Sequence, residues 1–271
     1  MLGLGNNLAR GGGVLSGLSN TYSLNFDGTD DSIDFGRTFD ELGAKAQGSL
    51  SIWIKTTSES GAGNVINDRG VTSGNKYLQM SVNDQPTYPD YTLSVSWEGG
   101  SNMYRYRNAW DVWNHFVITW HVANESRILY TNATTDVDGT KTDAFVFDAD
   151  KDDIRAGMYG AGAGFFTGLM DEIGIWNKQL DADAVTAIYN SGKPIALDAD
   201  SGNYDNSDDL VGWWRFEEGS GTSLSHTITG TDKVILKWDG DTPSVFDGMT
   251  TYTHSEILTE LAKSAWTEPD D

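Results

Sequence analysis

The chain has 271 residues and a formal net charge of −22, because 40 Asp and Glu residues outnumber 18 Lys and Arg residues. Such an acidic surface argues against phosphate backbones and anionic lipids as partners, so we expect neither nucleic acid nor a membrane. With no cysteine, the chain has no disulfide, no thiolate metal site and no cysteine nucleophile.

Residues 1–20 form a glycine-rich segment with a single charged side chain, Arg10. We expect an N-terminal arm here, because the triple glycine Gly11–Gly13 supports neither a helix nor a strand by itself. The segment lacks an apolar run of signal-peptide length, so we expect no signal peptide. No stretch of the chain approaches the roughly 18 consecutive apolar residues of a membrane-spanning helix.

From about Tyr22 to Trp176, apolar residues alternate with polar ones, which is the period of strands that bury one face. Turn residues such as Asp27-Gly28 and Asp138-Gly139 separate the runs. Strands that follow one another without helices between them predict an all-β, antiparallel sandwich or barrel. The predicted strands are centred on Leu24–Phe26, Ile33–Phe35, Leu50–Ile54, Leu93–Trp97, Phe116–Trp120 and Phe145–Phe147.

The pattern changes at Asp181, which begins a predicted short helix over residues 181–192. Asp181 caps its start, apolar residues recur at helical spacing, and Gly192 ends it. An acidic loop over 193–209 follows, and then predicted strands over 210–216 and 233–238. The last 20 residues predict an amphipathic helix that docks on the sheet or on a partner subunit.

Three stretches, in order, resemble laminin-G-like domains of the concanavalin A-like lectin/glucanase superfamily. They are Ser23–Ile33 (SLNFDGTDDSI), Trp113–Trp120 (WNHFVITW) with Ile128–Asn132 (ILYTN), and Gly168–Leu180 (GLMDEIGIWNKQL). The resemblance implies a jelly-roll sandwich with a short helix after its last main strand. We therefore expect an arm over 1–20, the jelly roll over 21–192, and a region over 193–271 that packs on the sandwich or on a neighbour.

Leu210–Thr222 (LVGWWRFEEGSGT) resembles a segment that normally precedes a laminin-G-like domain, but here it follows one. This order, together with the start of the chain, MLGLGNNL, resembles virion proteins of marine tailed phages. This similarity implies a non-enzymatic structural subunit of the virion, either a head decoration or a fibre-like appendage. Its partners are then further copies of itself, in a homo-oligomer, and other virion proteins, and it is assembled in the host cytoplasm.

A glucanase of this superfamily needs paired carboxylates on one strand face, spaced as Glu-x-Asp-x-Glu. No such triplet occurs in the chain. Asp171-Glu172 and Glu217-Glu218 are adjacent pairs, which we expect to point to opposite faces. We therefore predict no catalytic residues and leave glycoside hydrolysis as the least favoured alternative. His115 is expected on the strand face opposite Phe116, as a surface or hydrogen-bonded interior residue.

Calcium is the cation that the acidic loops suit best. Asp148, Asp150 and Asp152 have the opening spacing of an EF-hand, but Asp153 occupies the position that needs glycine, so an EF-hand is rejected. The laminin-G-like resemblance implies one structural Ca²⁺ at the rim of the sandwich. Its candidate ligands are Asp27, Asp30 and Asp171, each of which has an ordinary role in turns or strand bridging as the alternative.

The aromatic residues suggest a carbohydrate-binding alternative, because sugar rings stack on exposed aromatic side chains. The candidates are Trp97, Tyr104, Tyr106 and Trp110, with Trp113 beside them. Core packing and subunit interfaces compete for the same residues. The alternative function is therefore a calcium-dependent carbohydrate-binding module that recognises host-surface glycans.

Overall fold

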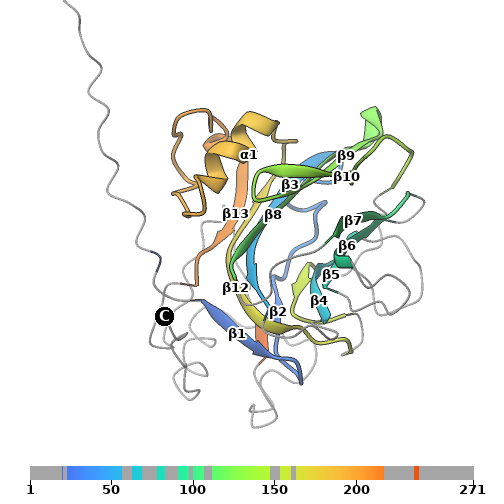
Figure 1. The fold of residues 1–271 in the computed structure, drawn as a ribbon, viewed down its shortest axis with the longest axis vertical. Helices are drawn as coiled ribbons and strands as arrows, with labels where there is room; N and C mark the ends of the chain where they lie inside the picture. Colours follow the sequence, from blue (N-terminus) through green and yellow to red (C-terminus); the bar gives the residue numbers. More distant parts are fainter. Residues whose placement is uncertain are drawn as a thin grey trace, which may run out of the picture.

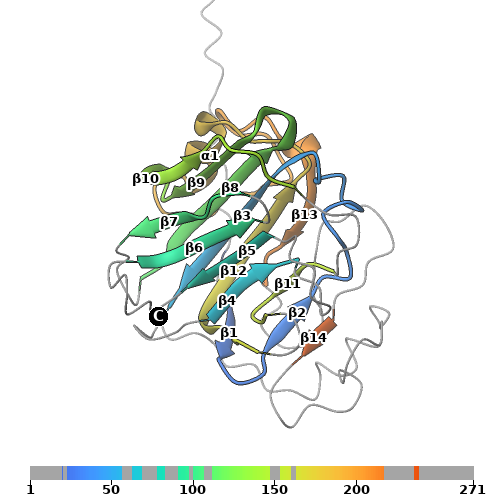
Figure 2. The ribbon, with the colours of Figure 1, turned by 90° about the vertical axis from the view of Figure 1, so that its right-hand side faces the viewer.

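The computed structural model describes residues 20, 23–56, 63–68, 78–82, 91–97, 100–106, 112–146, 153–159, 163–216 and 235–237. Their strands form two antiparallel sheets that face each other (Figures 1 and 2). The predicted all-β antiparallel sandwich is therefore confirmed.

The first sheet, sheet A, has the order β1-β12-β3-β8-β9-β10, with β13 also paired to β12. Its strands are β1 (Leu24–Asp27), β3 (Gln47–Lys55), β8 (Asn114–His121), β9 (Ser126–Thr131), β10 (Thr134–Lys141), β12 (Thr167–Trp176) and β13 (Leu210–Trp214). The second, sheet B, has the order β14-β2-β11-β4-β5-β6-β7. Its strands are β2 (Ser32–Asp34), β4 (Gly63–Asn67), β5 (Leu78–Val82), β6 (Tyr91–Trp97), β7 (Met103–Tyr106), β11 (Arg155–Ala156) and β14 (Ile235–Lys237).

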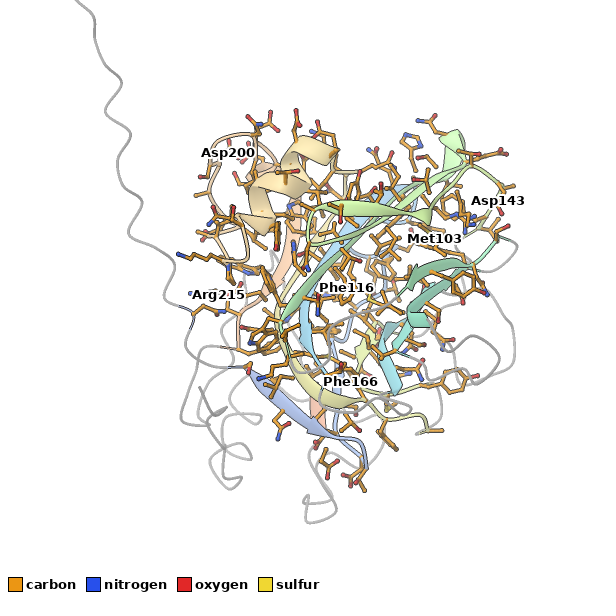
Figure 3. All side chains as sticks on the ribbon, viewed as in Figure 1. Met103, Phe116, Asp143, Phe166, Asp200 and Arg215 are labelled. Carbon is orange, nitrogen blue, oxygen red and sulfur yellow. The ribbon has the colours of Figure 1, made fainter. Side chains whose placement is uncertain are left out.

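Alternate side chains of both sheets fill the space between them. Leu50, Ile52 and Ile54 of β3 belong to this core, as do Phe116 of β8 and Met103 of β7. Figure 3 shows Phe116 and Met103 between the two layers. The period-two pattern thus correctly predicted which residues of β3 and β8 turn inward, whereas β7 with Met103 was not predicted.

A second apolar cluster covers the outer face of sheet A. Helix α1 (Ala182–Tyr189) and the chain that follows it lie against this face in Figure 1. Asp181 caps the helix by accepting the backbone N–H of Ala184, and the helix ends at Asn190 in the left-handed region rather than at Gly192. The cluster consists of Val117, Tyr130, Trp176, Leu180, Ala184, Val185, Ile188, Leu197, Tyr204 and Trp213. Sheet A is therefore buried on both faces.

The predicted strand at Phe145–Phe147 is wrong for the residues described, because residues 142–146 follow β10 without forming a strand. Phe145 is nevertheless buried, and its ring lies 5.7 Å from that of Trp97. The predicted arm, apart from Asn20, and the predicted C-terminal helix lie outside the described residues. No helix in the described part of the chain is long and apolar enough to cross a membrane.

A buried arginine ties the two sheets together at one end of the sandwich. Arg127 of β9 pairs with Asp143 and donates to the Ser101 carbonyl at 3.1 Å, in the turn between β6 and β7. Its guanidinium lies 4.7 Å from the ring of Phe145 and 5.4 Å from that of Trp97. Although partial burial alone raises the pKa of Asp143, the Ser101 N–H and the Arg127 charge hold that pKa below its ordinary value.

Candidate functional site

The outer face of sheet B carries a row of uncharged polar side chains across β4, β5, β6 and β7. Figure 2 shows these four strands side by side. Asn64 of β4 is paired with Ser81 of β5, Ser81 with Ser94 of β6, and Ser94 with Tyr104 of β7. Paired residues point to the same face, so these four side chains form a continuous line. Gln79 and Ser96, which are also paired, extend the row on the same face. We call these six residues the polar ladder.

Hydrogen bonds fix one end of the polar ladder. Gln79 Nε2 donates to Asn64 Oδ1 at 2.6 Å and to Ser81 Oγ at 2.9 Å, and Ser81 Oγ donates to the same Asn64 oxygen at 2.9 Å. Asn64 Nδ2 donates in turn to the Gly164 carbonyl at 3.1 Å. Asn64 and Ser81 are only 7% and 4% exposed, so this end is a buried, hydrogen-bonded support. The partly exposed members of the polar ladder are Gln79, Ser94, Ser96 and Tyr104.

The other end of the polar ladder is aromatic. Tyr104 is half-buried, and its hydroxyl accepts a hydrogen bond from Asn102 Nδ2 at 3.2 Å. Tyr106 lies two residues further along β7, where it is paired with Tyr91. Two of the predicted aromatic residues therefore belong to the strand that forms this edge of the face.

Trp97 is a correction to the predicted carbohydrate site. Its side chain is only 3% exposed and packs in the core, so its ring has no face to offer a sugar. The alternation along β6 contained the signal, because Leu93, Val95 and Trp97 share one face and that face is the core. Trp110 lies outside the described residues, and Trp113 is exposed just before β8.

Three aspartates meet at the turn between β1 and β2. Carboxylate oxygens of Asp27, Asp30 and Asp31 all lie within 4.8 Å of one another. Asp27 Oδ1 accepts the Thr29 N–H at 2.6 Å, and Asp31 Oδ2 accepts the Asp27 N–H at 2.9 Å. These bonds fold the turn so that the carboxylates converge, and a convergent set of hard oxygen donors suits Ca²⁺. The donor set therefore fits the predicted ion, and we call it the aspartate cluster.

Asp171 is not part of the aspartate cluster, so its predicted role as a ligand beside Asp27 and Asp30 is wrong. Asp27 is paired with Thr167 of β12, and Asp171 lies four residues, or about 13 Å, further along that strand. Its carboxylate accepts hydrogen bonds from Asn20 Nδ2 and from the Glu172 backbone N–H, both at 2.8 Å. Asp31, which the sequence pattern did not single out, is the third residue of the aspartate cluster.

A bulge in β12 overturns the expectation that Asp171 and Glu172 point to opposite faces. The register against β3 shifts between Asp171 and Gly174, and Glu172 has a φ of 48°. Glu172 accepts hydrogen bonds from Trp213 Nε1 at 2.6 Å and Arg215 Nε at 3.3 Å, on the outer side of sheet A. Both carboxylates are buried and bonded to protein groups, which makes them supports of the bulge. The Glu217-Glu218 pair lies outside the described residues, as do Asp148, Asp150 and Asp152.

His115 is an interior residue on the outer side of sheet A, beneath α1. Its Nε2 lies 2.6 Å from Ser51 Oγ, and its ring stacks on those of Trp53 and Tyr189 at centroid distances of 4.7 and 6.0 Å. Burial lowers the pKa of His115 to about 3, so the imidazole is neutral in the native state at neutral pH. Trp53 is likewise covered by the helical layer.

A model of the Concanavalin A-like lectin/glucanases superfamily matches residues 27–186. The chain belongs to this superfamily. The match covers most of both sheets and extends into α1. The aspartate cluster and the polar ladder both lie within the matched residues.

Several solved structures share this fold. The heptameric SAP-like pentraxin from Limulus polyphemus is 17% identical, with a TM-score of 0.51 over 80% of this chain and 94% of that one. The CBM40 of the Ruminococcus gnavus IT-sialidase, bound to α2,3-sialyllactose, is 17% identical, with a TM-score of 0.50 over 62% of this chain and 97% of that one. At sequence identities this low, the structural similarity establishes a common fold alone. A comparison with curated proteins found no match.

The buried imidazole predicts a pH dependence of stability. The unfolded chain binds a proton at His115 below a pH of about 6.5, whereas the native chain does so only near 3. The free energy of unfolding should therefore fall as the pH is lowered from 7 to 5, with this residue contributing at most about 1.4 kcal/mol per pH unit. Urea unfolding of His115→Gln should show a flatter profile over this window than that of the wild type. An unchanged slope in His115→Gln would contradict the assignment.

Proposed function

We propose that the protein is a carbohydrate-binding domain that holds a neutral glycan on the outer face of sheet B. The observation that carries this proposal is the polar ladder, whose members are paired in register across four strands. The amide of Gln79 and the hydroxyls of Ser94 and Ser96, which are partly exposed, can both donate and accept hydrogen bonds, as sugar hydroxyls do. Tyr104 adds an aromatic surface at the end of the row.

The charge of the chain supports a neutral ligand over an acidic one. None of the six side chains of the polar ladder is charged, and the whole chain carries −22. A ligand with a carboxylate or sulfate would therefore meet repulsion without a cation in the ladder to offset it. In this respect the proposed ligand differs from the sialyllactose bound to the Ruminococcus gnavus module.

Binding without catalysis is the activity that the described carboxylates favour. A glycoside hydrolase needs two carboxyl groups on either side of an accessible glycosidic bond. Asp171 and Glu172 are buried in the β12 bulge, on the outer side of sheet A and away from the polar ladder. The proposed domain therefore acts as a non-enzymatic binding module.

The binding proposal is tested on a glycan array with the full chain and with Ser94→Asp. An aspartate at the centre of the polar ladder introduces charge and bulk into the contact face, so binding to the preferred neutral glycan should weaken about tenfold or more. Thr186→Asp, on the exposed side of α1, is the matched control and should bind as wild type. Preference for sialylated glycans, or binding unchanged by Ser94→Asp, would contradict the proposal.

We also propose that the aspartate cluster holds one structural Ca²⁺, with Asp27, Asp30 and Asp31 as ligands. Such an ion neutralises three converging carboxylates and stiffens the turn between β1 and β2. Because Asp31 is only 4% exposed, the ion would lie against the body of the sandwich rather than in open solvent.

Calcium should raise the melting temperature of the wild-type chain relative to EDTA by a few degrees, since a ligand of the native state shifts unfolding. Asp31→Asn should lose most of this difference. Asp198→Asn, a carboxylate removed from an exposed loop, should retain it. Equal melting temperatures with calcium and with EDTA in the wild type would contradict the ion site.

A second role, as a structural subunit of a phage particle, rests on the two similarities at the N-terminus and at Leu210–Thr222. The two roles are compatible, because a virion protein can display a lectin-like domain outward. One contact supports an anchoring role for the predicted arm: Asn20, at its end, donates to the buried carboxylate of Asp171.

Deletion of residues 2–20 tests the arm in this role. If the arm attaches the protein to a particle, the truncated chain should fold but should no longer co-purify with particles in an infected or reconstituted system. Asn20→Ala isolates the single contact and should weaken the attachment less. Full incorporation of the truncated chain would contradict the arm as a tether.

A further inference from the structure

A pocket opens at the end of the sandwich where β3 begins and β8 ends. Its volume is about 680 Å³, within the usual range of ligand-binding pockets. Three segments that are distant in the sequence form it: the loop before β3, the end of β8 with the short 3-10 helix η1 (Val122–Asn124), and the chain after β10. We call it the rim pocket. It belongs to neither the polar ladder nor the aspartate cluster.

One wall of the rim pocket is apolar. Ala46, Val122 and Val146 contribute to it, each from a different segment. Val146 is 43% exposed, which makes it one of the large hydrophobic residues that the described surface leaves open to solvent. A small apolar group placed against this wall would remove Val146 from water.

Two polar side chains stand side by side in the rim pocket. Gln47 and His121 are register partners at the last rung between β3 and β8. His121 Nδ1 accepts the backbone N–H of Asn124 at 3.3 Å, which places the proton of the neutral imidazole on Nε2 and makes Nε2 a donor. The Gln47 amide makes no hydrogen bond to the described residues and offers both a donor and an acceptor.

The rim pocket carries little net charge. Its two charged lining residues, Lys45 and Asp40, form an ion pair at 3.1 Å and offset each other. A neutral ligand therefore fits better than a cation or an anion. It should present an acceptor for His121, a donor for Gln47 and a small apolar group for the wall.

We propose that the rim pocket binds the acetamido group of an N-acetylated sugar. The acetamido carbonyl accepts from His121 Nε2–H, its N–H donates to Gln47 Oε1, and its methyl group packs against Val122 and Val146. This inference rests on the proposed glycan-binding function and adds to it a second contact, on another part of the domain. A glycan with an N-acetylated residue would then be preferred over one without it.

The test is a titration of the full chain with N-acetylglucosamine and with glucose, followed by calorimetry or ligand-observed NMR. The wild type should bind N-acetylglucosamine about tenfold more tightly than glucose. Ala46→Leu fills the pocket and Gln47→Leu removes the amide at similar size, so each should abolish this preference. Ala182→Leu, on an exposed position of α1, is the matched control for Ala46→Leu and should keep it.

The outcomes separate this inference from the proposed function. Equal affinity for the two sugars, or a preference that Ala46→Leu retains, overturns the proposal that the rim pocket binds an acetamido group. This holds even if the glycan array shows binding that Ser94→Asp weakens. A preference that is lost in Ala46→Leu but retained in Ser94→Asp supports the rim pocket, whether or not the polar ladder binds a glycan. Thermal melts of each variant establish that the loss does not come from unfolding.

Discussion

Both faces of sheet A are buried, and this restricts where the domain can bind a ligand. The inner face of sheet A packs against sheet B, and its outer face is covered by α1 and the chain up to Tyr204. The covering layer is itself bonded in place, because Trp176 Nε1 donates to the Tyr204 hydroxyl at 3.0 Å and that hydroxyl donates to the Leu197 carbonyl at 2.6 Å. Among the described residues, the outer face of sheet B and the rims of the sandwich are therefore the surfaces open to a ligand, and all three proposed sites lie there.

Glycines make room for the large tryptophans that this packing needs. A Cβ at Gly48 would lie 2.5 Å from the ring of Trp120, one at Gly174 would lie 2.6 Å from that of Trp176, and one at Gly212 would lie 2.5 Å from that of Trp214. Each indole thus lies over a backbone without a side chain, on the partner strand or two residues away on the same strand. Some of the glycines of the sequence are therefore present to make room for tryptophan rings, and others are present to form turns.

Local sequence pattern predicted the sandwich well, because alternation directly encodes which face of a strand is buried. It failed where the backbone departs from a regular strand. The bulge at Glu172 reverses the expected direction of a side chain, and a pattern of residue types contains no signal for it. Two of the three residues of the aspartate cluster, Asp27 and Asp30, were predicted. Asp31 is the third in place of Asp171, because the turn brings residues four apart in the sequence together. The rim pocket combines three distant segments, so only the tertiary structure could reveal it.

The link between Arg127, Asp143 and the Ser101 carbonyl joins β9 of sheet A to the turn between β6 and β7 of sheet B. In a chain without cysteine, this link consists only of charge and hydrogen bonds. It forms without an oxidant and is not broken by a reductant. The integrity of that end of the domain is consequently independent of the redox conditions around it and sensitive instead to acid, which removes the charge of Asp143.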